Sequence, residues 1–166
     1  PRSWQAFRVL VRARLKWLAE HGPGVQSGAP RAQADVWMLL HPGVRDIAAA
    51  RFKSGHYADA VEAALKALNA EVKARVHTTP AKVLDGASLM TTVFSPKNPL
   101  LLLDDPSSQS GQAVQQGYMQ LFAGAMTGIR NPKAHDNVII TAERAIHFLF
   151  LASLLWFKLD EARPPR

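Results

Sequence analysis

The chain has 166 residues, of which 48% are hydrophobic, a formal net charge of +7 and no cysteine. This length suits one domain with its own core, and the ordinary apolar fraction argues against disorder throughout the chain. The lack of cysteine excludes disulfides and thiolate metal sites and suits a reducing compartment, so we expect a cytoplasmic protein.

Residues 1–40 are predicted to form a basic helical arm and a linker. In the first half of this segment, apolar side chains recur at three- and four-residue intervals, as they do on one face of a helix. Arg8, Arg12 and Lys16 form a row of cations beside that face. A stretch rich in glycine and proline follows, as expected of a loop, so residues 41–166 should form a separate domain. The first residues lack the apolar core of a leader, and we expect no signal peptide.

Positive charge is concentrated towards the start of the chain. Residues 1–53 contain nine Lys or Arg and three Asp or Glu, a net charge of +6, whereas residues 54–166 contain eleven and ten, a net charge of +1. A basic arm on a near-neutral body favours an acidic partner, most often nucleic acid. A surface that only keeps the protein soluble is the alternative interpretation.

Five helices are predicted in the body of the chain. They are expected at residues 42–53, 56–76, 85–95, 112–130 and 141–159. Pro42 suits the first turn of a helix, and apolar residues follow the helical period most clearly between Tyr57 and Val76. The run of leucines within residues 95–111 is expected either as a short strand or as apolar cover for the core. The predicted fold class is therefore all-α.

Two of these helices indicate a homodimer. Gly117, Gly124 and Gly128 lie along one line of the fourth helix, which would let another helix approach closely. The last helix is apolar on most sides and needs more cover than a small bundle supplies, so we expect one of these two helices in a dimer interface. Its apolar run, residues 145–157, is too short to cross a bilayer of about 30 Å, and we expect no membrane association.

The segment IRNPKAHD interrupts the long helical pattern. Pro132 disfavours the helical conformation in the residue before it, Asn131, so the long helix should end near Arg130. Asn is a preferred N-cap and Pro a preferred first residue, so a new helix should begin there, with His135 one turn into it. A cation, an imidazole and unpaired amides would then meet at a place suited to a phosphate. Spacing alone favours a plainer interpretation, in which Arg130 binds carbonyls at a helix end and His135 lies on the surface.

Other histidines indicate weaker possibilities. His135 and Asp136 form the His-Asp pair found in metal phosphohydrolases, which need further ligands on neighbouring helices. The other candidate ligands are His56, Asp59 and His77. Their spacing is not that of a ligand set, so we predict no metal and no cofactor. His147 lies in an apolar run, where a core histidine is expected.

The sequence RNPKAH has an arginine, four residues and a histidine, with a polar residue after the arginine. This pattern resembles the R-x4-H motif of the HEPN superfamily, all-helical prokaryotic proteins of which many are metal-independent endoribonucleases. The flanking segments are similar, in the same order, to the Ymh-type branch of that superfamily over about residues 41–160. They are HPGVRDIAAARFKSGHYADAVEAALKALNAEVK, LDGASLMTTVFS, GYMQLFAGAMTGIRNPKAH and AIHFLFLASLLWFKLD. The resemblance implies a HEPN-like helical bundle.

The resemblance also implies a dimer whose two motifs face each other across a basic cleft. Arg130 would bind the scissile phosphate, and His135 would assist proton transfer at the ribose 2′-hydroxyl or the leaving oxygen. Asn131 would orient one of these groups. The products would be a 2′,3′-cyclic phosphate and a 5′-hydroxyl. Candidate RNA contacts are Lys133, Arg8, Arg12 and Lys16.

Finally, the resemblance implies a toxin or an antiphage-defence effector, with RNA as substrate and an antitoxin or defence-system protein as partner. Asn137 stands where some HEPN toxins have a tyrosine that a partner nucleotidyltransferase modifies, which puts that route of regulation in doubt. The alternative is a non-catalytic HEPN module that binds RNA, a nucleotide or a protein partner, because some members keep the fold and lose cleavage.

Overall fold

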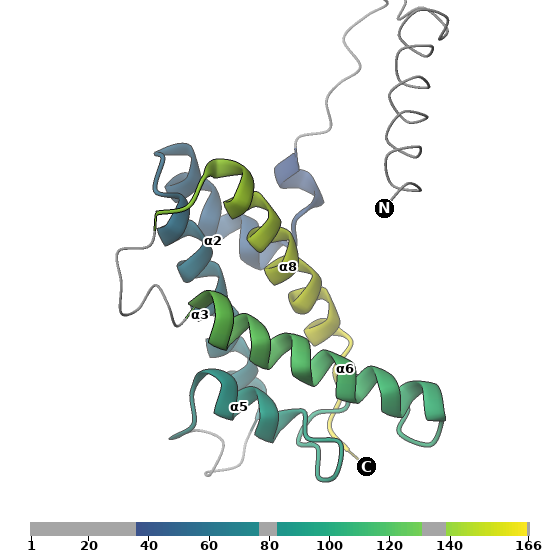
Figure 1. Ribbon diagram of the computed structural model, residues 1–166. Coiled ribbons are helices and arrows are strands. Elements are labelled where there is room, and N and C mark those ends of the chain that lie inside the picture. The colour runs from purple at the N-terminus through teal and green to yellow at the C-terminus, as the bar shows by residue number, and fades with distance from the viewer. Residues whose placement is uncertain (1–35, 77–82, 131–138, 166) are drawn as a thin grey trace, which may run out of the picture. The chain divides into compact units, whose positions relative to one another are not determined.

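The computed structural model describes residues 36–76, 83–130 and 139–165 (Figure 1). Their elements are η1 (Val36–Leu39, a 3-10 turn), α2 (Pro42–Lys53), α3 (Tyr57–Arg75), α5 (Gly86–Val93), α6 (Gln109–Ala125), η2 (Met126–Arg130, a π turn) and α8 (Ala142–Asp160). The all-α class is confirmed for these residues. The predicted basic arm, with Arg8, Arg12 and Lys16, lies outside them and stays a prediction.

All five helices predicted in the body are present, with ends that differ by a few residues. Three of them begin at a side chain that accepts a hydrogen bond from a backbone amide of the first turn. These side chains are His41 in α2, Ser108 in α6 and Thr141 in α8, with donor–acceptor distances of 3.0, 2.9 and 3.2 Å. The main difference lies in the fourth helix, which changes from α to π geometry after Ala125.

Helix α3 runs through the core and packs against α2, α5, α8 and η2. Leu65, Leu68 and Val72 on its inner face have no exposed surface. Figure 1 shows α8 beside α2 and α3, with α5 and α6 together at the other end of the bundle. This packing places η2 against both α3 and α5, so the helical run that ends at Arg130 meets two other elements.

The run of leucines covers the core. Leu101 and Leu103 are buried in it. The buried side chain of Gln115 accepts a hydrogen bond from the Leu103 amide at 2.8 Å and donates to the carbonyls of Phe94 and Leu101. Within the described ranges, the extended pairing is a single antiparallel bridge between residues 102 and 163. Apolar cover for the core is therefore the confirmed expectation, and a strand is not.

The apolar helix α8 packs on α2 and α3, where it buries Leu149 and Leu155. It also leaves Leu154 and Phe157 about half exposed, at 49% and 48%. None of the helices in the described part of the chain combines the length and the hydropathy that crossing a membrane requires.

Candidate functional site

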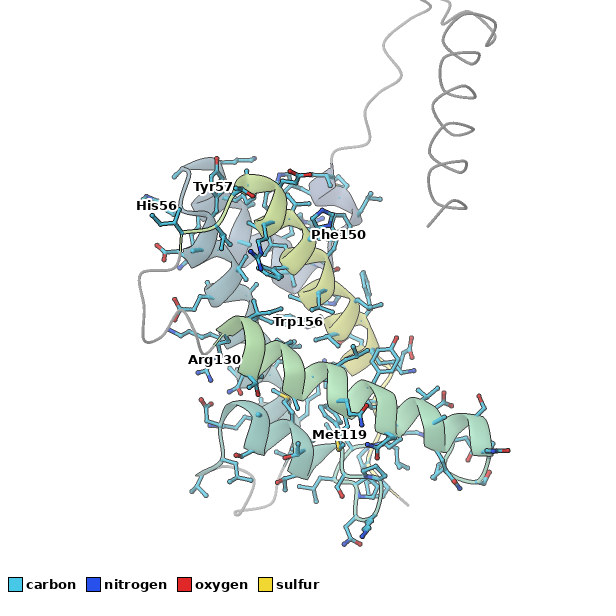
Figure 2. All side chains as sticks on the ribbon, in the orientation of Figure 1. His56, Tyr57, Met119, Arg130, Phe150 and Trp156 are labelled. Atoms are coloured by element: carbon cyan, nitrogen blue, oxygen red, sulfur yellow. The ribbon has the colours of Figure 1, made fainter. Side chains whose placement is uncertain are left out.

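Arg130 is the last residue of η2 and lies against α3 and α5 (Figure 2). Its side chain is 18% exposed, and its Nη1 donates a hydrogen bond of 2.8 Å to Oδ2 of Asp85. Arg130 therefore lies in a largely buried position rather than in open solvent. Among the described residues its hydrogen-bond partner is a carboxylate from another element, not the carbonyls of its own helix end.

Asp85 occupies the N-cap position of α5, but its side chain makes no capping hydrogen bond. Its carboxylate instead faces α3 and η2. Oδ1 accepts a hydrogen bond of 2.7 Å from Nδ2 of Asn69, and Nζ of Lys73 lies 3.6 Å from the same oxygen. Because Asn69 and Lys73 are four residues apart on one helix, they reach Asp85 from the same face of α3.

A buried amide completes the cluster. Asn69 is 5% exposed, and its Oδ1 accepts the backbone N–H of Gly86 at 2.8 Å. Gly86 has a φ of +56°, a conformation that glycine adopts without steric cost. A Cβ built there would lie 3.3 Å from Nη1 of Arg130, so the lack of a side chain also leaves room for the guanidinium.

The cluster carries two positive charges, on Arg130 and Lys73, against one negative charge on Asp85. Burial raises the pKa of Asp85, but hydrogen bonds from Arg130 and Asn69 and the charges of both cations outweigh burial and leave that pKa below its ordinary value. The Asp85 side chain is half exposed, so solutes can reach the cluster. The surplus positive charge suits an anionic ligand such as a phosphate.

The rest of the predicted site lies outside the described residues. Asn131, Lys133 and His135 are in this group, so the meeting of arginine and imidazole stays a prediction. The predicted helix start at Pro132 also lies there, as does the His-Asp pair at 135 and 136. Within the described ranges, no group of three His, Cys, Asp or Glu side chains could hold a metal ion.

Two other histidines are placed. His56 is exposed at the N-cap position of α3, where its side chain makes no capping hydrogen bond. His147 is exposed on α8, so the expectation of a core histidine is wrong. The apolar run around it misled that prediction, because α8 buries only one side and His147 points away from the core.

Sequence reasoning missed three residues of the cluster: Asn69, Lys73 and Asp85. A lysine outside the apolar period of a helix is expected to point to solvent, but the Lys73 side chain is only one-third exposed and faces Asp85. Asn69 did carry a signal, because it lies four residues after Leu65 on the apolar face, and a polar residue there needs a specific partner. Asp85 carried no signal in the sequence beyond that of a helix N-cap.

Comparison with known families shows which family the chain belongs to. A family model described as "Protein of unknown function (Hypoth_ymh)" matches residues 38–159. The chain belongs to the Hypoth_Ymh family. The match confirms the Ymh-type assignment predicted for about residues 41–160, and its range contains the whole cluster around Arg130. Searches of curated proteins and of solved structures found no match.

The Hypoth_Ymh description states no activity. Membership of the HEPN superfamily, and a nuclease role for the RNPKAH motif, therefore remain predictions from the resemblance.

Proposed function

We propose that this Hypoth_Ymh protein is a metal-independent endoribonuclease of the HEPN type. The observation that carries the proposal is the position of Arg130. Its side chain is largely buried and is held by the carboxylate of Asp85, in a cluster with surplus positive charge. In the sequence, Arg130 directly precedes the NPKAH segment. A guanidinium is permanently charged and presents its N–H donors in a fixed plane, which suits a phosphate in an RNA backbone.

The reaction would start from the ribose 2′-hydroxyl. His135 assists proton transfer from this hydroxyl or to the leaving 5′-oxygen, since an imidazole near its ordinary pKa of about 6.5 can do either at neutral pH. Arg130 binds the scissile phosphate and stabilises the charge that develops on it. Asn131 orients one of the reacting groups. The products are a 2′,3′-cyclic phosphate and a 5′-hydroxyl, and no cofactor takes part.

A homodimer with two facing motifs belongs to the same proposal. Exposed apolar side chains on α6 and α8 support it, namely Leu121 at 45%, Leu154 at 49% and Phe157 at 48%. Among the described residues, nothing within 4 Å would meet a Cβ added at Gly117, Gly124 or Gly128, so these glycines leave the surface of α6 and η2 open to a second copy.

The biological setting follows the resemblance. The protein would act in the cytoplasm as a toxin or antiphage effector, and an antitoxin or defence-system protein would control it. Lys133 and the basic row Arg8, Arg12 and Lys16 would add contacts to RNA.

One observation favours a second candidate. The ion pair with Asp85 already neutralises much of the charge of Arg130, as in many arginines whose role is structural. A non-catalytic module that binds RNA, a nucleotide or a protein partner would tolerate this arrangement.

RNA cleavage in EDTA separates the two candidates. The wild type should cleave tRNA, rRNA or mRNA under these conditions, and Arg130→Ala and His135→Ala should each lower the rate by at least about 10²-fold. Arg144→Ala and His147→Ala are matched controls, because both residues are exposed on α8. Circular dichroism would check that every variant is folded.

Cleavage that persists in both Arg130→Ala and His135→Ala would exclude this site. Cleavage that EDTA abolishes and Mn²⁺ restores would instead indicate a metal phosphohydrolase built on His135 and Asp136. No cleavage of any RNA by a folded wild type would favour the binding module.

A further inference from the structure

The carboxylate of Asp85 holds two cations at once. Nη1 of Arg130 donates to Oδ2 at 2.8 Å, and Nζ of Lys73 lies 3.6 Å from Oδ1. The first contact is a charge-assisted hydrogen bond, whereas the second is too long for a hydrogen bond and is a looser ion pair. Because both oxygens belong to one carboxylate, the two cations lie next to each other on one patch.

The Asp85 carboxylate can contact the two cations because Asn69 caps α5 in its place. Asn69 accepts the first amide of α5, from Gly86, at 2.8 Å, and donates to Oδ1 of Asp85 at 2.7 Å. The Asp85 side chain, which stands at the cap position, therefore makes no capping bond and turns to the cations. Asn69 is buried in the core face of α3, so it fixes Asp85 to a rigid element.

The patch is open enough to bind a ligand. Exposure is 50% for the Asp85 side chain, 33% for Lys73 and 18% for Arg130. A guanidinium has five N–H donors, and among the described residues Asp85 engages Nη1 alone. Two adjacent cations can each contact one phosphate, and a nucleic-acid strand presents phosphates in a row, whereas a single small anion offers one such group.

We propose that Asp85 organises Arg130 and Lys73 into a two-cation site for the RNA backbone. Arg130 binds the scissile phosphate and Lys73 binds the neighbouring one. This inference rests on the proposed nuclease and adds two residues to it. Asp85 is a positioning residue: its charge weakens the overall attraction for RNA, but its hydrogen bond sets the orientation of the guanidinium.

The salt dependence of binding tests Lys73. The probe is a single-stranded RNA with 2′-O-methyl groups throughout, which removes the attacking hydroxyl and prevents cleavage. Lys73→Met should lower the slope of log affinity against log salt by about 0.7, the value for one phosphate contact to a single strand. Met keeps much of the apolar stem of lysine, so packing changes little.

Lys66→Met is the matched control. Lys66 lies two turns earlier on α3, is 56% exposed and pairs with Glu62 at 2.7 Å. Its replacement should leave the slope unchanged. A Lys73→Met slope equal to that of the wild type would overturn the role of Lys73.

Cleavage at saturating RNA tests Asp85. Asp85→Asn keeps the shape of the side chain and removes one negative charge, so the probe should bind as tightly or more tightly. Cleavage of unmodified RNA should nevertheless fall by about 10²-fold, because a misplaced guanidinium loses its alignment with the reacting phosphate. Asp46→Asn, at an exposed residue on α2, is the control and should cleave normally.

This split between binding and turnover would not arise from a loss of stability, which melting temperatures would record separately. An Asp85→Asn variant that binds more tightly and cleaves at least as fast would show that Asp85 merely neutralises Arg130.

The outcome also separates this inference from the proposed nuclease. If the wild type binds the probe but cleaves no RNA, the nuclease fails, and the two-cation site stands if Lys73→Met and Arg130→Ala each lower the slope. If the wild type cleaves RNA through Arg130 and His135 but Lys73→Met keeps the wild-type slope, the nuclease stands and the two-cation site is wrong. A wild type that does not bind the probe also overturns the site.

Discussion

A single histidine side chain connects both ends of the described domain. Nδ1 of His41 accepts the Gly43 amide at 3.0 Å, so its proton lies on Nε2, which donates to Oδ2 of Asp160 at 2.8 Å. Nη2 of Arg75 binds the other carboxylate oxygen of Asp160 at 2.6 Å. His41 also stacks on Trp156, with ring centroids 5.3 Å apart. The start of α2, the end of α3 and the end of α8 are joined in this way.

The pH dependence of stability should report this connection. Burial raises the pKa of Asp160, but hydrogen bonds from Arg75 and His41 and the charge of Arg75 outweigh burial and leave this pKa below the ordinary value of 3.8. A carboxylate with a lowered pKa stabilises the fold above that ordinary value, and the stabilisation is lost as the pH falls through the folded pKa. Asp160→Asn should therefore melt about 3 °C below the wild type near pH 6, because a partly exposed ion pair contributes at most about 1 kcal/mol.

This difference in melting temperature should shrink as the pH falls from 3.8 through the lowered folded pKa of Asp160, because both proteins then carry a neutral side chain at position 160. Asp46→Asn is the control, since the pair of Asp46 with Arg45 is long, at 3.4 Å, and exposed. A difference for Asp160→Asn that stays constant with pH would contradict an electrostatic origin.

At the scale of the elements, glycine matters where one helix packs closely on another. A Cβ added at Gly43 in α2 would lie 2.6 Å from Cζ2 of Trp156 in α8, which is too close for real atoms. The three glycines of the run from α6 into η2 were expected to let another helix approach, with a dimer interface in view. Among the described residues of the single chain nothing lies within 4 Å of their added Cβ atoms, so an approach by a second copy stays a prediction.

Two alanine substitutions should therefore act in opposite directions. Gly43→Ala should destabilise the fold by about 1–3 kcal/mol, because Trp156 must move in a packed core. Gly117→Ala should stabilise it by up to about 1 kcal/mol, because alanine has the higher helix propensity and its Cβ meets no neighbour in the part of the chain that the structure describes. Urea unfolding monitored by circular dichroism gives both values. Equal effects would mean that α2 and α8 are farther apart than described.

At the scale of the whole molecule, two exposed apolar residues, Leu121 of α6 and Leu154 of α8, each lie about one turn from a contact between their helices. Nζ of Lys158 lies 5.4 Å from the centroid of the Tyr118 ring, which joins the two helices there. Leu154 is one turn before Lys158, and Leu121 is about one turn after Tyr118, so both lie near this contact. Exposed apolar side chains beside a contact between two helices are typical of an interface.

If this region forms the proposed dimer, Leu154→Glu should convert it to a folded monomer. Multi-angle light scattering at micromolar concentration would measure the mass, and circular dichroism would check the fold. Met38→Glu is the control, because Met38 is 68% exposed on η1, outside this region. A monomeric wild type would count against a composite site, and a Leu154→Glu dimer would place the interface elsewhere.

The sequence by itself determined the helices of this protein. Apolar periodicity and Pro42 at a first helical position act over one or two turns, so local chemistry decides them, and the five helices predicted at residues 42–53, 56–76, 85–95, 112–130 and 141–159 are present. The predicted arm helix and the predicted helix start at Pro132 lie outside the described residues. The family resemblance also came from the sequence, because motifs keep their order along the chain. It identified Arg130 as a residue of interest, although it assigned no partner to it.

Only the tertiary structure decided what surrounds Arg130. Asp85 is 45 residues away in the sequence, and no local pattern marks it as the partner. A polar residue on an apolar face, such as Asn69, signals that a partner exists but not which one. The packing of η2 against α3 and α5 brings these side chains next to Arg130. This packing depends on how the side chains of the whole core fit together, so it is a property of the assembled fold rather than of any one segment.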